Sequence, residues 1–126
     1  MTEVCGARIP LPDPVRILML DCDGVMTDGG MYFDASGQAM KRFDVKDGLG
    51  LVRLAEMGFP TAVVSGDQSA ISAARCDVLR IQYVVLGRMD KQTAVRELLE
   101  ETGLPAESAV YVGDDISDLP ALHMVG

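Results

Sequence analysis

Polar groups that could do chemistry follow each of four short apolar segments of this 126-residue chain. These groups are Asp21 and Asp23 after residues 15–20, Ser65 and Gly66 after 61–64, Lys91 shortly after 82–86, and Asp114 after 109–112. Carboxylates gathered in one place repel one another, and a divalent cation is their natural counterion. Because the donors are oxygens without histidine, the cation that they suit is Mg²⁺. Each motif alone also fits a solvated turn or a helix cap, so the prediction depends on their combination.

The apolar segments indicate which elements position these groups. Their short length and aliphatic content are typical of strands buried on both faces. Helical patterns lie between them, at residues 49–57, 70–79 and 93–101. Strands that alternate with helices predict an α/β fold, a three-layer Rossmann-like parallel sheet flanked by helices. Since ligands bind beyond the carboxyl ends of the strands in such sheets, the polar groups should converge at one edge.

Residues 29–43 depart from this alternation. Their pattern around the turn at 34–37 predicts an antiparallel β-hairpin, inserted directly after the first strand. Residues 15–126 are therefore expected to form a single domain that carries the hairpin as an insertion. Residues 1–14 contain three prolines and are expected to be an extended lead-in.

The composition excludes several classes of protein. The net charge of -8 argues against a nucleic-acid binder, whose footprint would be a basic surface. Three cysteines without paired spacing indicate a reducing compartment, and the amino-terminal residues do not form a signal peptide. No apolar segment is long enough for a membrane span. These observations predict a cytoplasmic protein that is not associated with membranes.

Several motifs together resemble the haloacid dehalogenase superfamily of phosphatases. They are LDCDGV at 20–25, VSG at 64–66, Lys91, and VGDDISD at 112–118. Within that superfamily, residues 21–29, 43–50 and 113–120 are similar to the small capless branch that includes the 3-deoxy-D-manno-octulosonate 8-phosphate phosphatases. The resemblance covers residues 15–126 and implies the same fold, with no cap domain, and phosphomonoester hydrolysis.

The resemblance also implies a role for each polar group. Asp21 would be the nucleophile that forms an aspartyl-phosphate, and Asp23 would be the general acid and base. Mg²⁺ would be held by the carboxylates of Asp21 and Asp114 and by the backbone carbonyl of Asp23. Ser65, Gly66 and Lys91 would bind the phosphoryl oxygens. Asp115 and Asp118 are interpreted as residues that cap a helix or support the ligands.

In this branch the hairpin and the segment after it determine specificity. By match, the residues expected to contact substrate are Asp44, Val45, Lys46, Asp47 and Gly48, with Arg75 at the anionic end of the substrate. A solvated helix residue is the alternative interpretation of Arg75. The substrate would be a small phosphorylated sugar acid, such as 3-deoxy-D-manno-octulosonate 8-phosphate. Without a cap, neighbouring subunits would close the site, so the resemblance implies a homotetramer whose hairpins form the shared interface.

The chain departs from the pattern of that branch in four places. Asp67 stands where an arginine is usual, and Val52 stands at a frequently basic position next to Arg53. Cys22 occupies a usually apolar position, where it is expected to pack as a small hydrophobic residue with a raised thiol pKa. The resemblance also predicts a further strand and a tail beyond Gly126, which this sequence does not contain.

Two other interpretations stay open at this point. The chain could be a phospho-accepting receiver domain, which shares the fold class and the acidic residues. However, the second aspartate, Asp23, and the serine at the end of the middle strand favour an enzyme. It could also be a non-catalytic oligomerisation domain of the kind fused to acylneuraminate cytidylyltransferases. Such domains tend to lose the nucleophile or the acid-base residue, whereas this chain keeps both.

Overall fold

A four-stranded parallel sheet forms the centre of the molecule, as seen in the computed structural model, which describes residues 3–4, 7–8 and 15–126. The strand order is β7-β6-β3-β8. The strands are β3 (Ile17–Leu20), β6 (Thr61–Val64), β7 (Tyr83–Val85) and β8 (Ala109–Val112). All four lie within or match the segments predicted from the sequence. The first of them, β3, lies between β6 and β8, so its carboxyl end is central.

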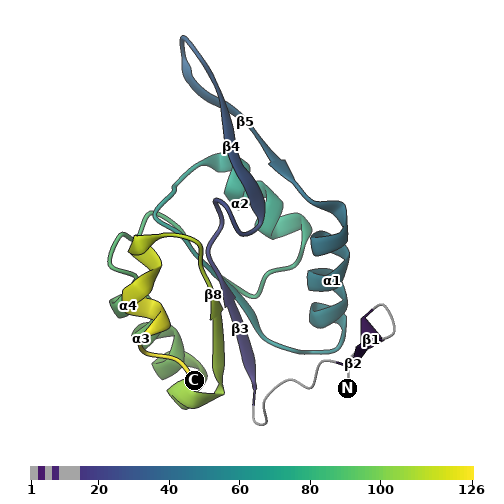
Figure 1. Cartoon of the computed structure of the whole chain (residues 1–126), viewed down its shortest axis with the longest axis vertical. Helices are drawn as coiled ribbons and strands as arrows, with labels where there is room; N and C mark the ends of the chain where they lie inside the picture. Colours follow the sequence, from purple (N-terminus) through teal and green to yellow (C-terminus); the bar gives the residue numbers. More distant parts are fainter. Residues whose placement is uncertain (1–2, 5–6, 9–14) are drawn as a thin grey trace.

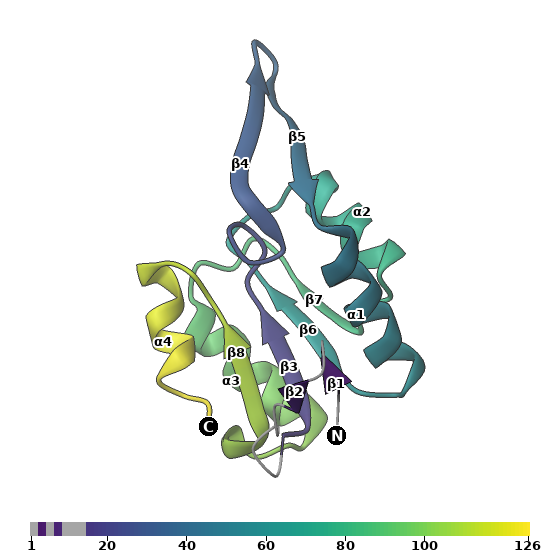
Figure 2. The ribbon, with the colours of Figure 1, turned by 45° about the vertical axis from the view of Figure 1, so that its right-hand side comes forward.

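Helices cover both faces of this sheet (Figures 1 and 2). The helices are α1 (Val45–Glu56), α2 (Ala70–Val78), α3 (Lys91–Thr102) and α4 (Leu119–Leu122), with short 3-10 turns η1 (Ala106–Ser108) and η2 (Ile116–Asp118). Residues of α1 and α2 pack in one core cluster, and those of α3 and α4 pack in the other. The predicted three-layer α/β architecture is therefore confirmed.

The side chains of β3 explain how one strand serves both layers. Ile17 and Met19 are fully buried on the face covered by α3, whereas Leu18 and Leu20 lie on the face covered by α1. Alternate residues of a strand point to opposite faces, so an all-apolar sequence is needed here. Cys22 extends the α1-side cluster and is fully buried, and burial raises the pKa of its thiol. Cys22 therefore packs as a small hydrophobic residue, as expected.

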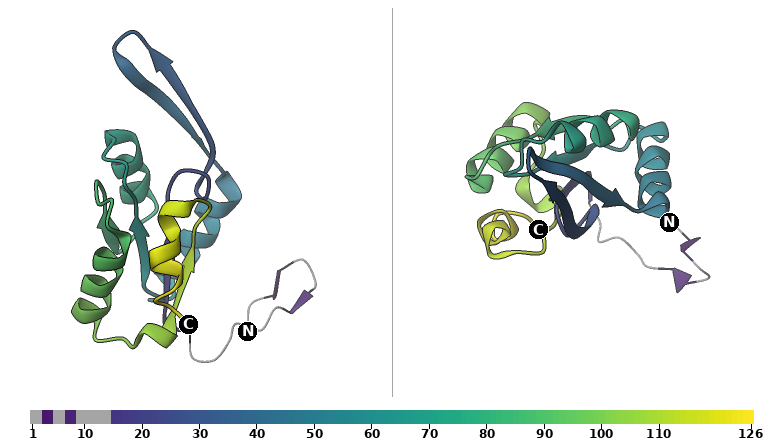
Figure 3. Two further views of the ribbon diagram at one scale, coloured as in Figure 1. Left: turned by 60° about the vertical axis from the view of Figure 1, so that its left-hand side comes forward. Right: turned by 90° about the horizontal axis from the view of Figure 1, so that it is seen from above.

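The hairpin predicted after the first strand is present and extends away from the sheet (Figures 1 and 3). Its strands are β4 (Thr27–Asp34) and β5 (Gly37–Phe43), which pair antiparallel with Tyr32 opposite Met40. Asp34 closes the turn because its Oδ1 accepts a hydrogen bond from the backbone N–H of Ser36 at 2.8 Å. The hairpin then leads directly into α1.

Helix α1 begins earlier than the helical pattern at 49–57 predicts. Asp44 is its N-cap, and the Asp44 carboxylate accepts hydrogen bonds from the backbone N–H groups of Lys46 at 2.7 Å and Asp47 at 3.1 Å. Gly48 and Gly50 obscure the helix in the sequence because glycine weakens helices. Capping at Asp44 and packing of the buried Gly48 outweigh that weakness.

The amino-terminal region contributes two short strands, β1 (Glu3–Val4) and β2 (Ala7–Arg8), which pair antiparallel. The rest of the lead-in expected at 1–14 lies outside the described residues. Within the described part of the chain, no helix has both the length and the apolar character needed to cross a membrane.

Candidate active site

A cavity of about 360 Å³ opens at the carboxyl ends of the central strands. Its lining includes the polar groups that the sequence places after the strands, namely Asp21, Asp23, Ser65, Gly66, Lys91 and Asp114. These residues follow different strands of the chain, and the parallel sheet brings the carboxyl ends of those strands together. The convergence expected at one edge is therefore present in the structure.

Asp21 lies at the centre of this cavity, directly after β3, and is only 6% exposed. Its Oδ1 accepts hydrogen bonds from the backbone N–H of Cys22 at 2.7 Å and pairs with the Nζ of Lys91 at 3.1 Å. Burial raises the pKa of Asp21 to about 6, although the Cys22 N–H and Lys91 oppose that shift. No hydrogen bond to Oδ2 is found among the described residues, so this oxygen remains available.

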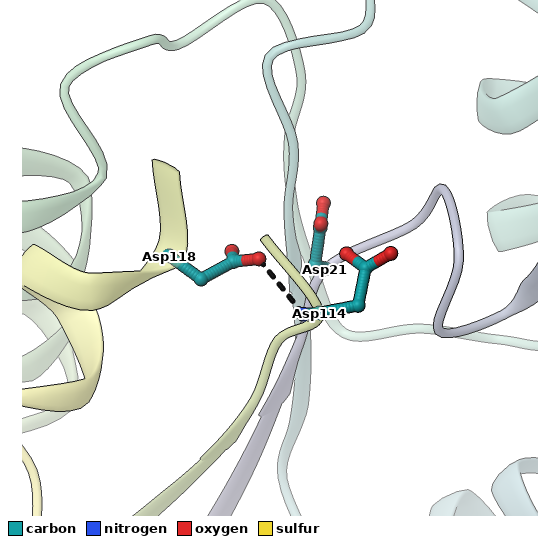
Figure 4. A group of neighbouring side chains, drawn as sticks. All are labelled: Asp21, Asp114 and Asp118. Carbon is teal, nitrogen blue, oxygen red and sulfur yellow. Dashed lines mark hydrogen bonds between the residues drawn. The ribbon is translucent and has the colours of Figure 1, made fainter. Parts of the chain in front are cut away.

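The carboxylates of three residues, Asp21, Asp114 and Asp118, lie close together in the site (Figure 4). One oxygen from each lies within 4.8 Å of the others. They come from three separate segments, since Asp21 follows β3, Asp114 follows β8, and Asp118 ends η2. Such a group is unfavourable unless cations compensate the charge.

Asp118 uses both of its oxygens for hydrogen bonds within the protein, and it is fully buried. Its Oδ1 accepts from Lys91 Nζ at 2.6 Å and from the hydroxyl of Tyr111 at 2.6 Å. Its Oδ2 accepts from the backbone N–H groups of Asp114 at 3.0 Å and Asp115 at 3.2 Å. Burial would raise the pKa of Asp118, but the bonds from Lys91 and Tyr111 outweigh it and lower that pKa. Asp118 therefore fixes the loop after β8 through hydrogen bonds to its backbone, which is consistent with a supporting role.

The remaining donors suit a divalent cation. Asp114 is exposed, and its carboxylate fills the space that a Cβ on Gly24 would occupy and makes no hydrogen bond with any described residue. The ammonium of Lys91 contacts this group of three carboxylates, and it is already paired with Asp21 and Asp118. A surplus of negative charge, presented by oxygen donors alone, is the environment that Mg²⁺ prefers.

The lining of the cavity also contains groups that can bind an anion. Ser65 is 2% exposed and follows β6, and its Oγ accepts a hydrogen bond from the backbone N–H of Asp67 at 3.1 Å. Gly66 lies beside Met89, where a Cβ would approach the sulfur to 2.6 Å. The side chain of Lys91 reaches the cavity from the first turn of α3, and its ammonium contacts Asp21. A hydroxyl, a glycine backbone and an ammonium thus line the same cavity as the carboxylates.

Sequence reasoning did not identify Lys41, a residue of the hairpin strand β5. Its side chain is 0% exposed, and its Nζ lies 2.8 Å from Asp23 Oδ1 and 2.7 Å from Asp67 Oδ2. Asp67, the anion that stands where an arginine is usual in the resembling branch, is therefore neutralised within the molecule. Burial would raise the pKa of Asp67, but hydrogen bonds from Lys41, Ser69 and Ser72 lower it to about 2.

The segment expected to contact substrate lies elsewhere. The described lining of the cavity includes none of the residues Asp44, Val45, Lys46, Asp47, Gly48 and Arg75. Arg75 instead packs over the ring of Phe43, 5.4 Å from its centroid, and donates to the backbone carbonyl of Asp44 at 3.3 Å. It is only partly exposed, so it is not a fully solvated helix residue either. In this chain Arg75 braces the junction between the hairpin and α1.

Comparison with known proteins places this arrangement in a family. No protein-family model matches the sequence. The chain is 41% identical over 112 residues to the 3-deoxy-D-manno-octulosonate 8-phosphate phosphatase KdsC of Haemophilus influenzae, and the match covers 89% of this chain and 62% of that protein. This chain thus spans less than two thirds of the length of that curated relative.

Solved structures give the same result. A 3-deoxy-D-manno-octulosonate 8-phosphate phosphatase of Moraxella catarrhalis, in complex with magnesium, phosphate and KDO, superposes with a TM-score of 0.84 at 34% identity and covers 89% of this chain and 64% of that one. A protein of Streptomyces avermitilis described as a HAD family hydrolase has a TM-score of 0.87 at 33% identity, covering 94% of this chain and 72% of that one. The chain therefore belongs to the haloacid dehalogenase superfamily and is similar to its octulosonate phosphatase branch.

Proposed function

We propose that the chain is the catalytic unit of a Mg²⁺-dependent phosphomonoester hydrolase that acts through an aspartyl-phosphate intermediate. The observation that carries this proposal is the single cavity that Asp21, Asp23 and Asp114 line together with Ser65 and Lys91. Similarity to enzymes named as phosphatases supports it further. The same similarity favours it over a receiver domain, and the retention of both Asp21 and Asp23 favours it over a silent oligomerisation domain.

In the first step, a carboxylate oxygen of Asp21 attacks the phosphorus of the substrate. We assign this role to Oδ2, because Oδ1 is engaged by Cys22 and Lys91. The bond between phosphorus and the leaving oxygen breaks, and its electron pair stays on that oxygen. Asp23 donates its proton to the leaving oxygen, so that the alcohol departs neutral and Asp23 becomes a carboxylate.

In the second step, water attacks the phosphorus of the aspartyl-phosphate. The carboxylate of Asp23 takes a proton from this water, which restores the acid form of Asp23. The bond between phosphorus and the Asp21 oxygen breaks, inorganic phosphate is released, and the Asp21 carboxylate is regenerated. Asp23 thus acts as the general acid in the first step and as the general base in the second.

Mg²⁺ would be held by Asp21 and Asp114 together with the backbone carbonyl of Asp23. When bound, it supplies positive charge that offsets repulsion between the carboxylates and the phosphate and stabilises charge in the transition state. Ser65, Gly66 and Lys91, which line the same cavity, hold the phosphoryl oxygens. These groups orient the phosphorus for attack by Asp21.

The substrate that we propose is 3-deoxy-D-manno-octulosonate 8-phosphate or a related phosphorylated sugar acid, following the names of the relatives. The segment 44–48 and Arg75 would contact the distal part of this substrate. Because they lie outside the lining of the cavity in a single chain, we propose that neighbouring subunits bring them to the substrate. We therefore propose a homotetramer assembled through the hairpins, where Tyr32 and Phe33 are 59% and 68% exposed. Free, buried Cys22 and Cys76 support a reducing, cytoplasmic setting.

The test is phosphate release from 3-deoxy-D-manno-octulosonate 8-phosphate and a panel of sugar phosphates, with Mg²⁺ and with chelator. The expected result is turnover that requires Mg²⁺ and is abolished by Asp21→Asn. The matched control is Asp77→Asn, which changes an exposed aspartate of α2 and should leave turnover unchanged. Unchanged turnover in Asp21→Asn, or no phosphate release from any substrate with Mg²⁺ present, would refute the proposal.

A further inference from the structure

Lys41 lies next to the cavity, and the proposed mechanism gives it no role. It belongs to the hairpin, yet its ammonium lies between two loops of the catalytic edge. The loop after β3 contributes Asp23, and the loop after β6 contributes Asp67. Lys41 and Asp23 are 18 positions apart, and they meet because Lys41 lies near the end of β5, where the second strand of the hairpin returns to the catalytic edge.

The ammonium of Lys41 is held in place by more than one anchor. Besides its two carboxylate partners, Nζ lies 3.2 Å from the Oγ of Ser72. Asp67 is itself fixed, because its Oδ2 also accepts from Ser69 Oγ at 2.7 Å and from Ser72 Oγ at 2.9 Å. A cation with this many fixed partners has a defined position, and hydrogen bonds between ionised groups are the strong ones.

Lys41 does not reach the substrate itself. Its side chain is 0% exposed, and it is absent from the described lining of the cavity, whereas both of its carboxylate partners line it. It differs in this respect from Lys91, which is also buried but borders the cavity. Any influence of Lys41 on catalysis must therefore pass through Asp23 or Asp67.

The contact with Asp23 selects one oxygen of that carboxylate. Lys41 Nζ occupies Oδ1 at 2.8 Å, and no hydrogen bond to Oδ2 is found among the described residues. Oδ2 is therefore the oxygen that this contact leaves free. The Asp23 side chain is 34% exposed and lines the cavity, so Oδ2 can reach a leaving group.

We propose that Lys41 is a positioning residue for the general acid, that it fixes the rotamer of Asp23 with Oδ2 available to the leaving oxygen, and that Asp67 is its anchor. This inference rests on the proposed function, because it assumes that Asp23 donates the proton. It assigns to Asp67 a supporting role through its ion pair with Lys41. It also links the hairpin to the chemistry.

The experiment compares two substrates that differ in their need for a proton. The alcohol of a sugar phosphate leaves only when protonated, whereas the phenolate of dinitrophenyl phosphate leaves without a proton. We expect Lys41→Met to lower kcat/KM for 3-deoxy-D-manno-octulosonate 8-phosphate by about 100-fold and for dinitrophenyl phosphate by less than about 3-fold. The ratio kcat/KM is chosen because it reports only the steps through aspartyl-phosphate formation.

Two further variants keep the test decisive. Lys41→Met leaves two carboxylates without their ammonium, and adding Asp67→Asn removes the less exposed of the two, which could unfold the single variant. The double variant should show the same selective loss. Arg42→Met is the matched control, because Arg42 is the next residue of β5 and its side chain is 68% exposed. It removes one positive charge from the same strand and should leave both substrates unaffected.

The outcomes separate this inference from the function on which it rests. Equal losses on both substrates in the double variant, or no loss on the sugar phosphate, would overturn the positioning role while the phosphatase assignment stands. A wild-type protein that hydrolyses neither substrate with Mg²⁺ would refute the proposed function and this inference with it. A selective loss on the sugar phosphate supports both.

Discussion

The Nζ of Lys91 and the Oδ1 of Asp118 lie 2.6 Å apart in the interior of the protein, although 27 residues separate them. This pair joins the first turn of α3 to the loop after β8. Both side chains are almost completely buried, at 4% and 0% exposed. The contact therefore fixes the position of the ammonium that faces Asp21, and it does so without using solvent-exposed groups.

Breaking this pair should destabilise the fold. Asp118→Asn leaves Lys91 with one carboxylate partner, so we expect the free energy of unfolding to fall by about 2–4 kcal/mol. Urea denaturation measures this change. The control is Glu97→Gln, which breaks the surface pair with Arg88 at 3.1 Å and should leave the midpoint unchanged within error. Equal effects of the two substitutions would show that the buried pair contributes no more to the free energy of unfolding than the surface pair does.

Gly24 should be essential for cation binding. Its φ of +80° is unfavourable for other residues, and a Cβ at this position would overlap the carboxylate of Asp114. We expect Gly24→Ala to displace that carboxylate and to weaken Mg²⁺ binding at least about ten-fold. Isothermal titration calorimetry with Mg²⁺ alone provides the measurement.

The control for this substitution is Gly58→Ala. Gly58 has a similar φ of +73°, but no atom lies within 4 Å of the added Cβ. Both variants carry the backbone strain of a left-handed alanine, on the order of 1 kcal/mol. Only Gly24→Ala should change the affinity for Mg²⁺, and a comparable loss in Gly58→Ala would point to general destabilisation instead.

Stability without metal should depend on pH through Asp21. The folded-state pKa of about 6 lies above the ordinary value of 3.8, because burial disfavours the charged form. The favourable contribution of Asp21 is therefore complete below 3.8 and is lost as the pH rises through about 6. Asn keeps the site neutral at every pH. Relative to wild type, metal-free Asp21→Asn should gain on the order of 1–3 kcal/mol between about pH 4 and about pH 8.

Chemical denaturation at the two pH values checks this expectation, and EDTA keeps the site free of metal. Added Mg²⁺ should then stabilise the wild type at the higher pH and have little effect on Asp21→Asn, since the variant lacks one proposed ligand. A difference between the proteins that stays constant with pH would mean that ionisation of Asp21 does not oppose folding.

The sequence was sufficient to predict the strands and the convergence of their polar ends, because both depend on local patterns. Apolar runs identify buried strands, and the parallel arrangement fixes which end faces the ligand. The start of α1 was harder to predict. Asp44 and Asp47 resemble a capping pair, but Gly48 and Gly50 have low helix propensity, so the pattern did not predict a helix there. Gly48 packs closely against Arg75, and such a contact between distant segments is not visible in a local pattern.

Contacts between distant segments account for the rest. Lys41 and Asp67 are 26 residues apart, and neither has a neighbour in the sequence that signals a buried ion pair. The charge reversal at position 67 was visible, but its partner depends on how the hairpin returns to the sheet. The pair Lys91 and Asp118 was hidden for the same reason. Ion pairs between distant residues form only once the fold brings the segments together, so local sequence patterns do not predict them.

The proposed assembly makes the last prediction, which concerns the tip of the hairpin. Phe33 is 68% exposed, and Tyr32, Met31 and Met40 beside it are also exposed, so the hairpin presents an apolar surface that suits a second copy of the chain. We expect the wild type to sediment as an oligomer and Phe33→Asp to sediment as a monomer, because a buried charge at an interface is strongly unfavourable. The matched control is Val78→Asp on α2, where the side chain is 67% exposed and the oligomer should persist. A monomeric wild type, or an oligomer that survives Phe33→Asp, would exclude the hairpin as the shared interface and would require the site to be complete within one chain.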